Sequence, residues 1–241
     1  MTPLLAEAVA IDLDGTLIDT ESEICSAVNT TLMHFGHAAL SAGRIVSLTG
    51  RGTKALLEAA LHLSPPAPGR PAATPSAAAQ LLDAALGQFK AAYAGVLGTQ
   101  CQVYPGVREG LTLLRQKQLK MVCVTNKAAE EAAYLLSRFE LTPYFEALIA
   151  PETPLQRKPA PYMLEKAAAL LGVPTACMVL VGDSNNDVLA ARAAGSPVIR
   201  LATGYERFLS VKQQADRDCH DFLAAAQTIE RSASPKPPGS P

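Results

Sequence analysis

Five short runs of hydrophobic residues have the length and character of buried β-strands. The first covers residues 8–11 and ends abruptly at Asp12, just before a turn that contains a glycine. An uncharged run this short, bounded by turn residues, is typical of a strand in a parallel sheet that is covered on both faces. The four later runs have the same character and lie at residues 121–124, 147–149, 178–181 and 198–201.

Segments with helical spacing of apolar residues separate these runs. Leu111, Leu114 and Leu119 belong to one such segment, and residues 132–139 and 164–171 form two others. When strands alternate with helices along the chain, the strands form a parallel sheet with right-handed crossover connections. The pattern therefore predicts an α/β protein with a Rossmann-like parallel sheet.

Residues 20–98 break this alternation, because their hydrophobic residues follow helical periods and show no strand pattern. We therefore predict a helical cap domain at 20–98, inserted into an α/β core made of residues 1–19 and 99–231. Inside the cap, residues 64–71 contain too many prolines to continue a helix and are assigned to a loop. The tail 232–241 is rich in proline and serine, so we expect it to be disordered.

The composition narrows the class of protein. The chain has 241 residues, of which 49% are hydrophobic, and a formal net charge of −1. Because it has no basic stripe and no apolar run long enough to span a bilayer, we expect neither a nucleic-acid partner nor a membrane partner. The N-terminus lacks the positive segment of a signal peptide, so we expect a cytoplasmic protein, either a monomer or a homodimer. The five cysteines have no paired or zinc-binding spacing, which indicates reduced thiols.

Four short polar motifs stand where the predicted strands end. In a parallel sheet the carboxyl ends of the strands meet at one edge, and open α/β sheets bind their ligands there. Any one motif has an ordinary alternative: a DxDG sequence can be a simple turn, and Asp187 can cap a helix that begins near Val188. The motifs are Asp12-Leu13-Asp14-Gly15-Thr16, Thr125-Asn126-Lys127, Lys158-Pro159-Ala160-Pro161 and Gly182-Asp183-Ser184-Asn185-Asn186-Asp187.

The chemistry of the four motifs is complementary. Several carboxylates at one edge would repel each other unless a cation lay among them. Oxygen ligands without cysteine or histidine select a hard ion, most commonly Mg²⁺. Together with such an ion, Lys158, the Thr125 hydroxyl and the Asn126 amide would form a binding site for a phosphoryl group.

The order of the motifs and the residues in them resemble those of the haloacid dehalogenase superfamily, in particular its phosphatases with a helical cap inserted after the first motif. The resemblance runs from Ala8 to about Tyr205. It implies that Asp12 is the nucleophile and forms an aspartyl-phosphate, while Asp14 protonates the leaving oxygen and later activates water. This role requires a proton on Asp14, which we expect neighbouring acids and partial burial to favour.

The resemblance also implies the remaining site residues. Thr125 and Asn126 would bind the phosphoryl oxygens, and Lys158 would steady both the nucleophile and the phosphate. The implied magnesium ligands are Asp12, the backbone carbonyl of Asp14, Asp183 and Asp187.

Several short stretches of the sequence are similar to those of the bacterial phosphoglycolate phosphatases, notably Thr125-Asn126-Lys127 and residues 141–145 and 203–205. This resemblance implies hydrolysis of 2-phosphoglycolate. In the cap, Arg51 lies in a glycine-rich turn and is a candidate for the substrate's carboxylate, with a solvated arginine as the alternative. Ile11, where a phenylalanine usually precedes the nucleophile, departs from the pattern.

Other functions stay open on the sequence. The nearest are a phosphatase of another small phosphate ester or of pyrophosphate, and a phosphomutase of the same superfamily, which uses the same intermediate. A non-catalytic binding protein on this scaffold would usually have lost one of the acids or the lysine. A nucleotide-binding module of the Rossmann type would carry a GxGxxG motif after a strand, which this chain lacks.

Overall fold

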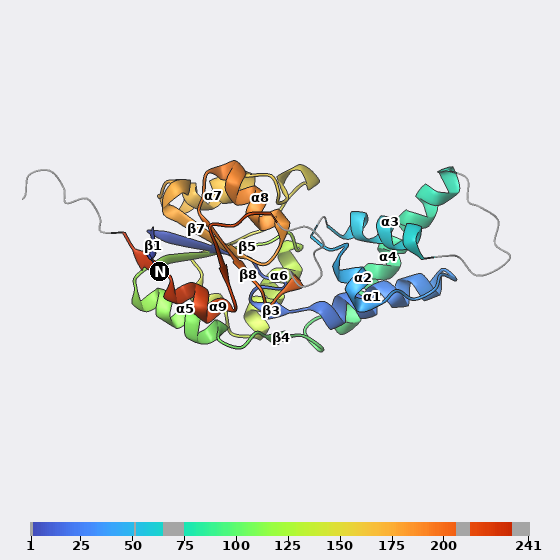
Figure 1. Cartoon of the computed structure of the whole chain (residues 1–241). Helices are drawn as coiled ribbons and strands as arrows, with labels where there is room; N and C mark the ends of the chain where they lie inside the picture. The colour runs from blue at the N-terminus through green and yellow to red at the C-terminus, as the bar shows by residue number, and fades with distance from the viewer. Residues whose placement is uncertain (1, 51, 65–74, 206–212, 233–241) are drawn as a thin grey trace, which may run out of the picture.

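The computed structural model of the chain describes residues 2–50, 52–64, 75–205 and 213–232 (Figure 1). Most of the proline-rich segment predicted as a loop (64–71) and nearly all of the predicted disordered tail (232–241) lie outside these ranges. Among the described residues, no helix combines the length and the apolar character needed to cross a membrane.

A six-stranded parallel sheet forms the larger part of the molecule, with the strand order β6-β5-β2-β7-β8-β9. The first strand, β2, lies inside the sheet, with β5 on one side and β7 on the other. The chain therefore reverses its direction of winding next to β2, which creates the kind of switch point where α/β sheets bind ligands. The strands are β2 (Ala8–Ile11), β5 (Lys120–Val124), β6 (Ala147–Ile149), β7 (Met178–Gly182), β8 (Val198–Leu201) and β9 (Arg217–Cys219).

All five predicted strands occur in this sheet, and the predicted α/β fold is confirmed. The bounds of β2, β6 and β8 match the apolar runs, while β5 and β7 are each one residue longer. The sixth strand, β9, escaped the pattern because it is short and consists mainly of charged residues at the sheet edge. Two further strand pairs are equally short: β1 (Leu4–Ala6) with β10 (Ile229–Arg231), and β3 (Ile18–Asp19) with β4 (Gln102–Val103).

Helices cover both faces of the sheet, as Figure 1 shows. In β2, Val9 and Ile11 face one hydrophobic core, and Ala8 and Ala10 face another, because successive side chains of a strand point to opposite faces. The first core contains α5 (Val107–Gln116), α6 (Ala129–Arg138) and α9 (Phe222–Gln227). The second contains α7 (Tyr162–Leu171) and α8 (Asn185–Ala194).

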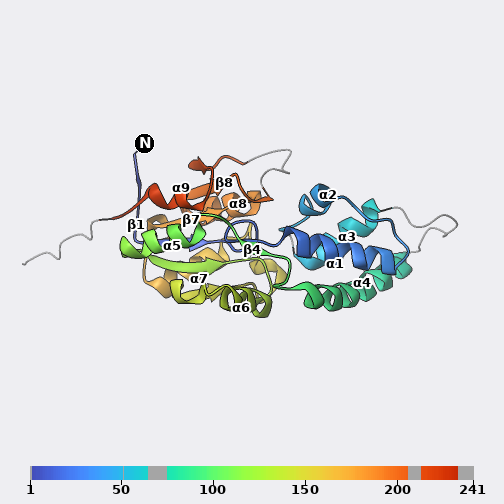
Figure 2. The ribbon, with the colours of Figure 1, turned by 90° about the horizontal axis from the view of Figure 1, so that it is seen from below.

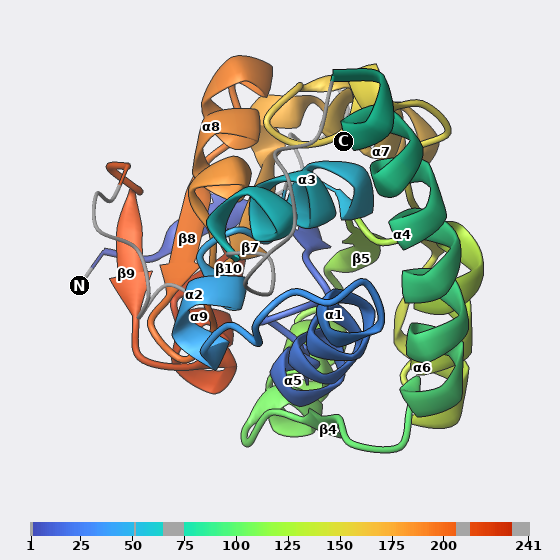
Figure 3. The same ribbon diagram turned by 90° about the vertical axis from the view of Figure 1, so that its right-hand side faces the viewer.

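Between β3 and β4 the described residues form four helices, here called the helical group, which lie beyond one end of the sheet (Figures 1 and 2). They share a third hydrophobic core, whose members include Val28, Leu57 and Phe89. Figure 3 looks onto this group, with the sheet behind it. The helices are α1 (Glu21–His34), α2 (Ala42–Val46), α3 (Thr53–Leu63) and α4 (Pro75–Val96).

A buried carboxylate joins the two chain segments that connect the helical group to the sheet. Glu23, in the first turn of α1, is fully buried. Its Oε1 accepts hydrogen bonds from the backbone N–H groups of Thr99, Gln100 and Cys101 at 2.8, 2.9 and 3.1 Å. The segment that leaves the core is thereby tied to the segment that returns to it.

Candidate active site

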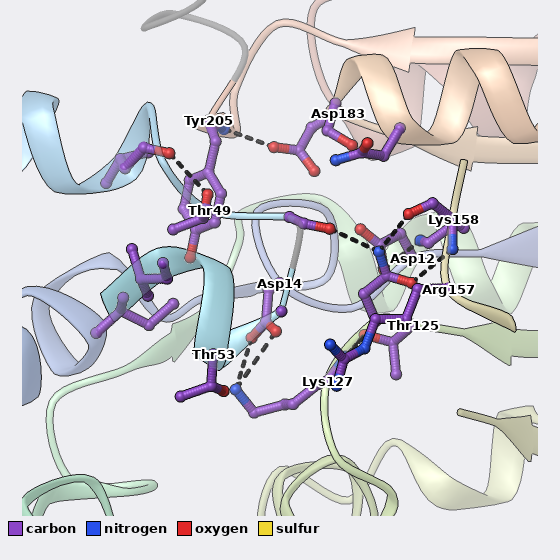
Figure 4. A pocket seen from close by; sticks show the side chains of 18 of the residues that line it. Asp12, Asp14, Thr49, Thr53, Thr125, Lys127, Arg157, Lys158, Asp183 and Tyr205 are labelled. Atoms are coloured by element: carbon purple, nitrogen blue, oxygen red, sulfur yellow. Dashed lines mark hydrogen bonds and ion pairs between the residues drawn. The ribbon is translucent and has the colours of Figure 1, made fainter. Parts of the chain in front are cut away.

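The structure brings the four motifs together at the carboxyl edge of β2, β5 and β7, facing the helical group (Figure 4). They line one side of a cavity of about 310 Å³. The opposite side comes from the helical group and includes Gly50, Thr53, Leu56 and Tyr93. Side chains from distant parts of the sequence therefore enclose one small space.

Asp12 and Lys158 form an ion pair at the bottom of this site. Asp12 follows β2 directly and is 7% exposed, and Lys158 is 2% exposed. The Lys158 Nζ lies 2.8 Å from Asp12 Oδ1 and 2.6 Å from Asp187 Oδ1, and it donates a hydrogen bond of 2.9 Å to the carbonyl of Val124. The three N–H bonds of the ammonium group are thus all directed at acceptors, which holds Asp12 in one orientation.

Asp187 is both a helix-capping residue and a site residue. Helix α8 begins at Asn185, three residues before the predicted start, with Ser184 as its N-cap. The Asp187 Oδ2 accepts hydrogen bonds from the backbone N–H and the hydroxyl of Ser184 at 3.0 and 2.6 Å, while Oδ1 binds Lys158. The capping box therefore positions the carboxylate that neutralises part of the lysine's charge.

Asp183 lies in a tight enclosure formed by the first motif and the segment after β8. Its carboxylate accepts hydrogen bonds from Thr16 Oγ1 at 3.0 Å and from the backbone N–H of Tyr205 at 2.6 Å. A Cβ on Gly15, which has φ of +83°, would lie 2.8 Å from the Asp183 Cγ. Only glycine allows both this backbone conformation and this close approach.

Burial and mutual repulsion raise the pKa values of these acids. Burial is the largest cause for Asp12, whose pKa rises from 3.8 to about 7; the Lys158 charge opposes the rise and the Asp187 charge adds to it. The pKa of Asp183 is raised well above its usual value by burial, with contributions from Asp12 and Asp187. An ionised cluster of this kind requires more positive charge than Lys158 alone supplies.

The donor set fits a divalent cation. Asp12, Asp183 and Asp187 each offer an oxygen atom within 4.8 Å of the others, and all three residues are buried. Three carboxylates against one ammonium group leave an excess negative charge that a dication would balance. The ligands are all oxygen, which suits a hard ion such as Mg²⁺. The remaining predicted ligand, the backbone carbonyl of Asp14, stays a prediction.

The groups that contact the Asp14 carboxylate are Lys127 and Thr20. The expectation that neighbouring acids and partial burial favour a proton on Asp14 stays a prediction. The Lys127 Nζ lies 3.1 and 3.3 Å from the two oxygens of Asp14, and the Thr20 hydroxyl donates a bond of 2.8 Å. Lys127 belongs to the second motif, and sequence reasoning gave it no role of its own.

Lys127 also contacts the helical group. Its Nζ donates a hydrogen bond of 2.6 Å to the hydroxyl of Tyr93 on α4, and it lies 4.8 Å from the centre of that ring. The pKa of Lys127 is raised: burial lowers it, but Asp14 and Tyr93 outweigh that effect. Tyr93 is buried and gave no sequence signal, because an aromatic residue on the apolar face of a helix is usually a core residue.

Thr125 and Asn126 are used differently. The Thr125 Oγ1 accepts a hydrogen bond of 3.2 Å from the backbone N–H of Lys127, so its own proton can be donated to a ligand in the cavity. The Asn126 amide instead donates to the carbonyls of Gly50 and Lys158 at 2.7 and 2.9 Å and accepts from the N–H of Lys158 at 2.8 Å. Because this amide is occupied, Asn126 fastens the helical group to the Lys158 segment, and its contact with a phosphoryl group stays a prediction.

Arg51, the predicted contact for the substrate's carboxylate, lies outside the described residues. Its neighbours Gly50 and Gly52 line the cavity, and so does Arg157, which directly precedes Lys158. Sequence reasoning passed over Arg157. Its position beside a motif lysine was the only available signal.

A model of the haloacid dehalogenase-like hydrolases matches residues 6–195 of the chain. The chain therefore belongs to this family, as the resemblance of its motifs predicted. The phosphoglycolate phosphatase (plasmid) of Cupriavidus necator is 41% identical over 198 residues, which are 82% of this chain and 81% of that protein. The phosphoglycolate phosphatase of Nitrosospira multiformis is 35% identical and covers 96% of this chain and 99% of its own length.

The fold is shared with a solved structure described as a predicted phosphoglycolate phosphatase from Haemophilus somnus 129PT. The TM-score is 0.78 at 23% sequence identity, over 90% of this chain and 95% of that chain. At this level of identity the likeness concerns the fold alone.

Proposed function

We propose that the protein is a magnesium-dependent phosphatase that hydrolyses 2-phosphoglycolate through an aspartyl-phosphate on Asp12. The observation that carries this proposal is the placement of Asp12, held at 2.8 Å by Lys158, in the same small cavity as Asp14 and the Thr125 hydroxyl. Asp12 would act as the nucleophile, Asp14 would transfer the proton, and the Thr125 hydroxyl would donate a hydrogen bond to the phosphate. All three lie around one space. The names of the similar proteins from C. necator and N. multiformis support the substrate.

In the first step an oxygen of the ionised Asp12 carboxylate attacks phosphorus, and the bond from phosphorus to the ester oxygen breaks. Lys158 fixes the orientation of Asp12 and adds positive charge beside the transferred phosphoryl group. The Thr125 hydroxyl donates a hydrogen bond to a phosphoryl oxygen. Such fixed donors stabilise the charge that develops on these oxygens in the transition state.

Asp14 handles the proton of both steps. It donates a proton to the departing alcohol oxygen. In the second step it takes a proton from the water that attacks phosphorus, the bond from phosphorus to the Asp12 oxygen breaks, and inorganic phosphate leaves. Thr20 and Lys127 hold the Asp14 carboxylate toward the cavity.

Asp12, Asp183 and Asp187 would hold Mg²⁺, together with the carbonyl of Asp14. The ion would neutralise charge between the nucleophile and the phosphate. The Thr16 and Tyr205 hydrogen bonds orient Asp183 for this role.

We further propose that residues 20–98 act as a cap over a catalytic core of 1–19 and 99–231. The separate hydrophobic core of the helical group and its position over the cavity support this division. The expectations of a cytoplasmic location and of a monomer or homodimer belong to the same proposal.

The test is a kinetic comparison of the wild-type protein and Asp12→Asn. With Mg²⁺ present, the wild-type protein should hydrolyse 2-phosphoglycolate with a higher kcat/KM than other small phosphate esters in a panel. D12N should lose at least about 1,000-fold in kcat, because the amide is a poor nucleophile. Substantial turnover by D12N would refute the nucleophile, and a better substrate in the panel would refute 2-phosphoglycolate.

A further inference from the structure

The cavity contains an arginine, Arg157, whose charge is not paired with a carboxylate of any described residue. Arg157 lies between the short 3-10 turn Pro154–Gln156 and α7, and it lines the cavity together with Asp12 and Thr125 (Figure 4). Lys127 and Lys158, the other two cations among the described residues that line the cavity, each pair with a carboxylate. The Arg157 guanidinium has neither an ion pair nor a hydrogen bond with any residue in the described ranges, and its Nε is buried without a hydrogen-bond partner.

The position of the guanidinium is set by the helical group. Arg157 has an extended backbone (φ of −65° and ψ of 145°) and lines the cavity beside Lys158. Lys158 reaches the sheet edge, while the Arg157 guanidinium packs against Gly52, at the start of α3. A Cβ on Gly52 would lie 2.6 Å from the Arg157 Cζ, so the glycine makes room for the charged group.

An anion is the ligand that such a group requires. A buried guanidinium N–H without an acceptor costs free energy, which a carboxylate oxygen would recover. The planar guanidinium also binds a carboxylate through two parallel hydrogen bonds, which an ammonium group cannot reproduce. Within the same cavity, Asp12, Lys158 and Thr125 already form the place for a phosphoryl group.

We propose that Arg157 binds the carboxylate of the substrate and so makes the enzyme selective for phosphate esters of small hydroxy acids. The inference rests on the phosphatase function proposed above and assigns one end of its substrate. The phosphoryl group lies at Asp12, and the carboxylate lies toward Gly52 and the helical group. Selectivity thus depends on a core residue that the helical group holds in place.

The experiment compares two substrates of equal chain length, 2-phosphoglycolate and 2-hydroxyethyl phosphate, which lacks the carboxylate. The ratio of their kcat/KM values should fall at least about tenfold in Arg157→Ala, which is the usual loss for a charged hydrogen bond. Arg157→Lys should recover only part of the ratio, since the charge remains but the paired N–H geometry is lost. Arg44→Ala, which removes an exposed arginine of α2, is the matched control and should keep the wild-type ratio.

Four outcomes would overturn the proposal. A wild-type ratio in R157A, with a melting temperature that shows a folded protein, would remove Arg157 from carboxylate binding. A fall of the ratio in Arg51→Ala but not in R157A would assign the carboxylate to Arg51 instead. If the wild-type protein hydrolyses neither ester, both the phosphatase function and this inference fail; if it hydrolyses both without preference, only the carboxylate selectivity fails.

Discussion

Single residues in this site serve structure and chemistry together. Asp187 completes the capping box at the start of α8 and also binds Lys158. Gly15 allows the turn of the first motif and leaves room for the carboxylate of Asp183. Such a residue can therefore be a helix cap or a turn residue and still have a role in the proposed active site.

At the residue scale, Gly15→Ala should disrupt the cation site. A Cβ would meet the Asp183 carboxylate, and the positive φ adds about 1–2 kcal/mol of strain for a residue with a side chain. Gly36→Ala is the matched control, because Gly36 has φ of +72° but open space where a Cβ would lie. We expect both variants to lower the free energy of unfolding and only G15A to weaken Mg²⁺-dependent activity strongly. Equal activities of the two variants would contradict this account of Gly15.

At the element scale, the Tyr93 hydroxyl group of α4 reaches Asp14 through the Lys127 ammonium group. The chain Tyr93–Lys127–Asp14 runs from the helical group to the first motif and is drawn in part in Figure 4. Asn126 makes a second connection, to Gly50. Both contacts exist only when the helical group lies against the sheet edge, so its position and the arrangement around Asp14 are coupled.

Tyr93→Phe removes this hydroxyl and keeps the ring. We expect a loss of about 1 kcal/mol in the free energy of unfolding, from the missing hydrogen bond, and a several-fold lower kcat because Lys127 holds Asp14 less firmly. Tyr134→Phe, on a half-exposed tyrosine of α6, is the control and should change neither quantity. Denaturant unfolding and steady-state kinetics measure the two effects. A kcat for Y93F equal to that of the wild type would contradict the coupling.

At the scale of the whole molecule, the buried acids link stability, pH and metal binding. Without metal, the pKa of Asp12 is about 7, above its usual 3.8. At a pH between these two pKa values, Asp12 holds a proton in the folded protein but not in the unfolded chain. The contribution of Asp12 to the stability of the metal-free protein therefore falls as the pH rises toward 7. A bound dication requires the ionised acid, and protons compete with it below pH 7.

We therefore expect Mg²⁺ to raise the melting temperature more at pH 8 than at pH 5.5, relative to protein in EDTA. Chelator should also remove activity, and added Mg²⁺ should restore it. Thermal denaturation in the two buffers measures the shift, with Asp183→Asn as the control that should respond little at either pH. A Mg²⁺ shift of the same size at both pH values would contradict proton competition at Asp12.

Much of the architecture followed from local patterns. The apolar runs identified five of the six sheet strands, because a strand buried on both faces has to be hydrophobic along its length. The strand β9 and the short helix α2 escaped detection, since neither is long enough to show a period. Helix α8 begins earlier than expected, because Ser184 and Asp187 form its capping box.

The sequence by itself determined which motifs gather at the carboxyl edge of the sheet. The motifs of Asp12, Lys158 and Asp183 lie next to strands of one parallel sheet or next to the helices that cover it. The topology of the sheet brings the three motifs to one edge. Only the tertiary structure decided the rest: that Lys127 binds Asp14 across 113 residues of chain and that Arg157 lies unbalanced against Gly52. The first contact depends on the pairing of β2 with β5, and the second on how the helical group packs over the sheet. Both bring together residues far apart in the chain, and no local pattern of hydrophobic and polar positions records them.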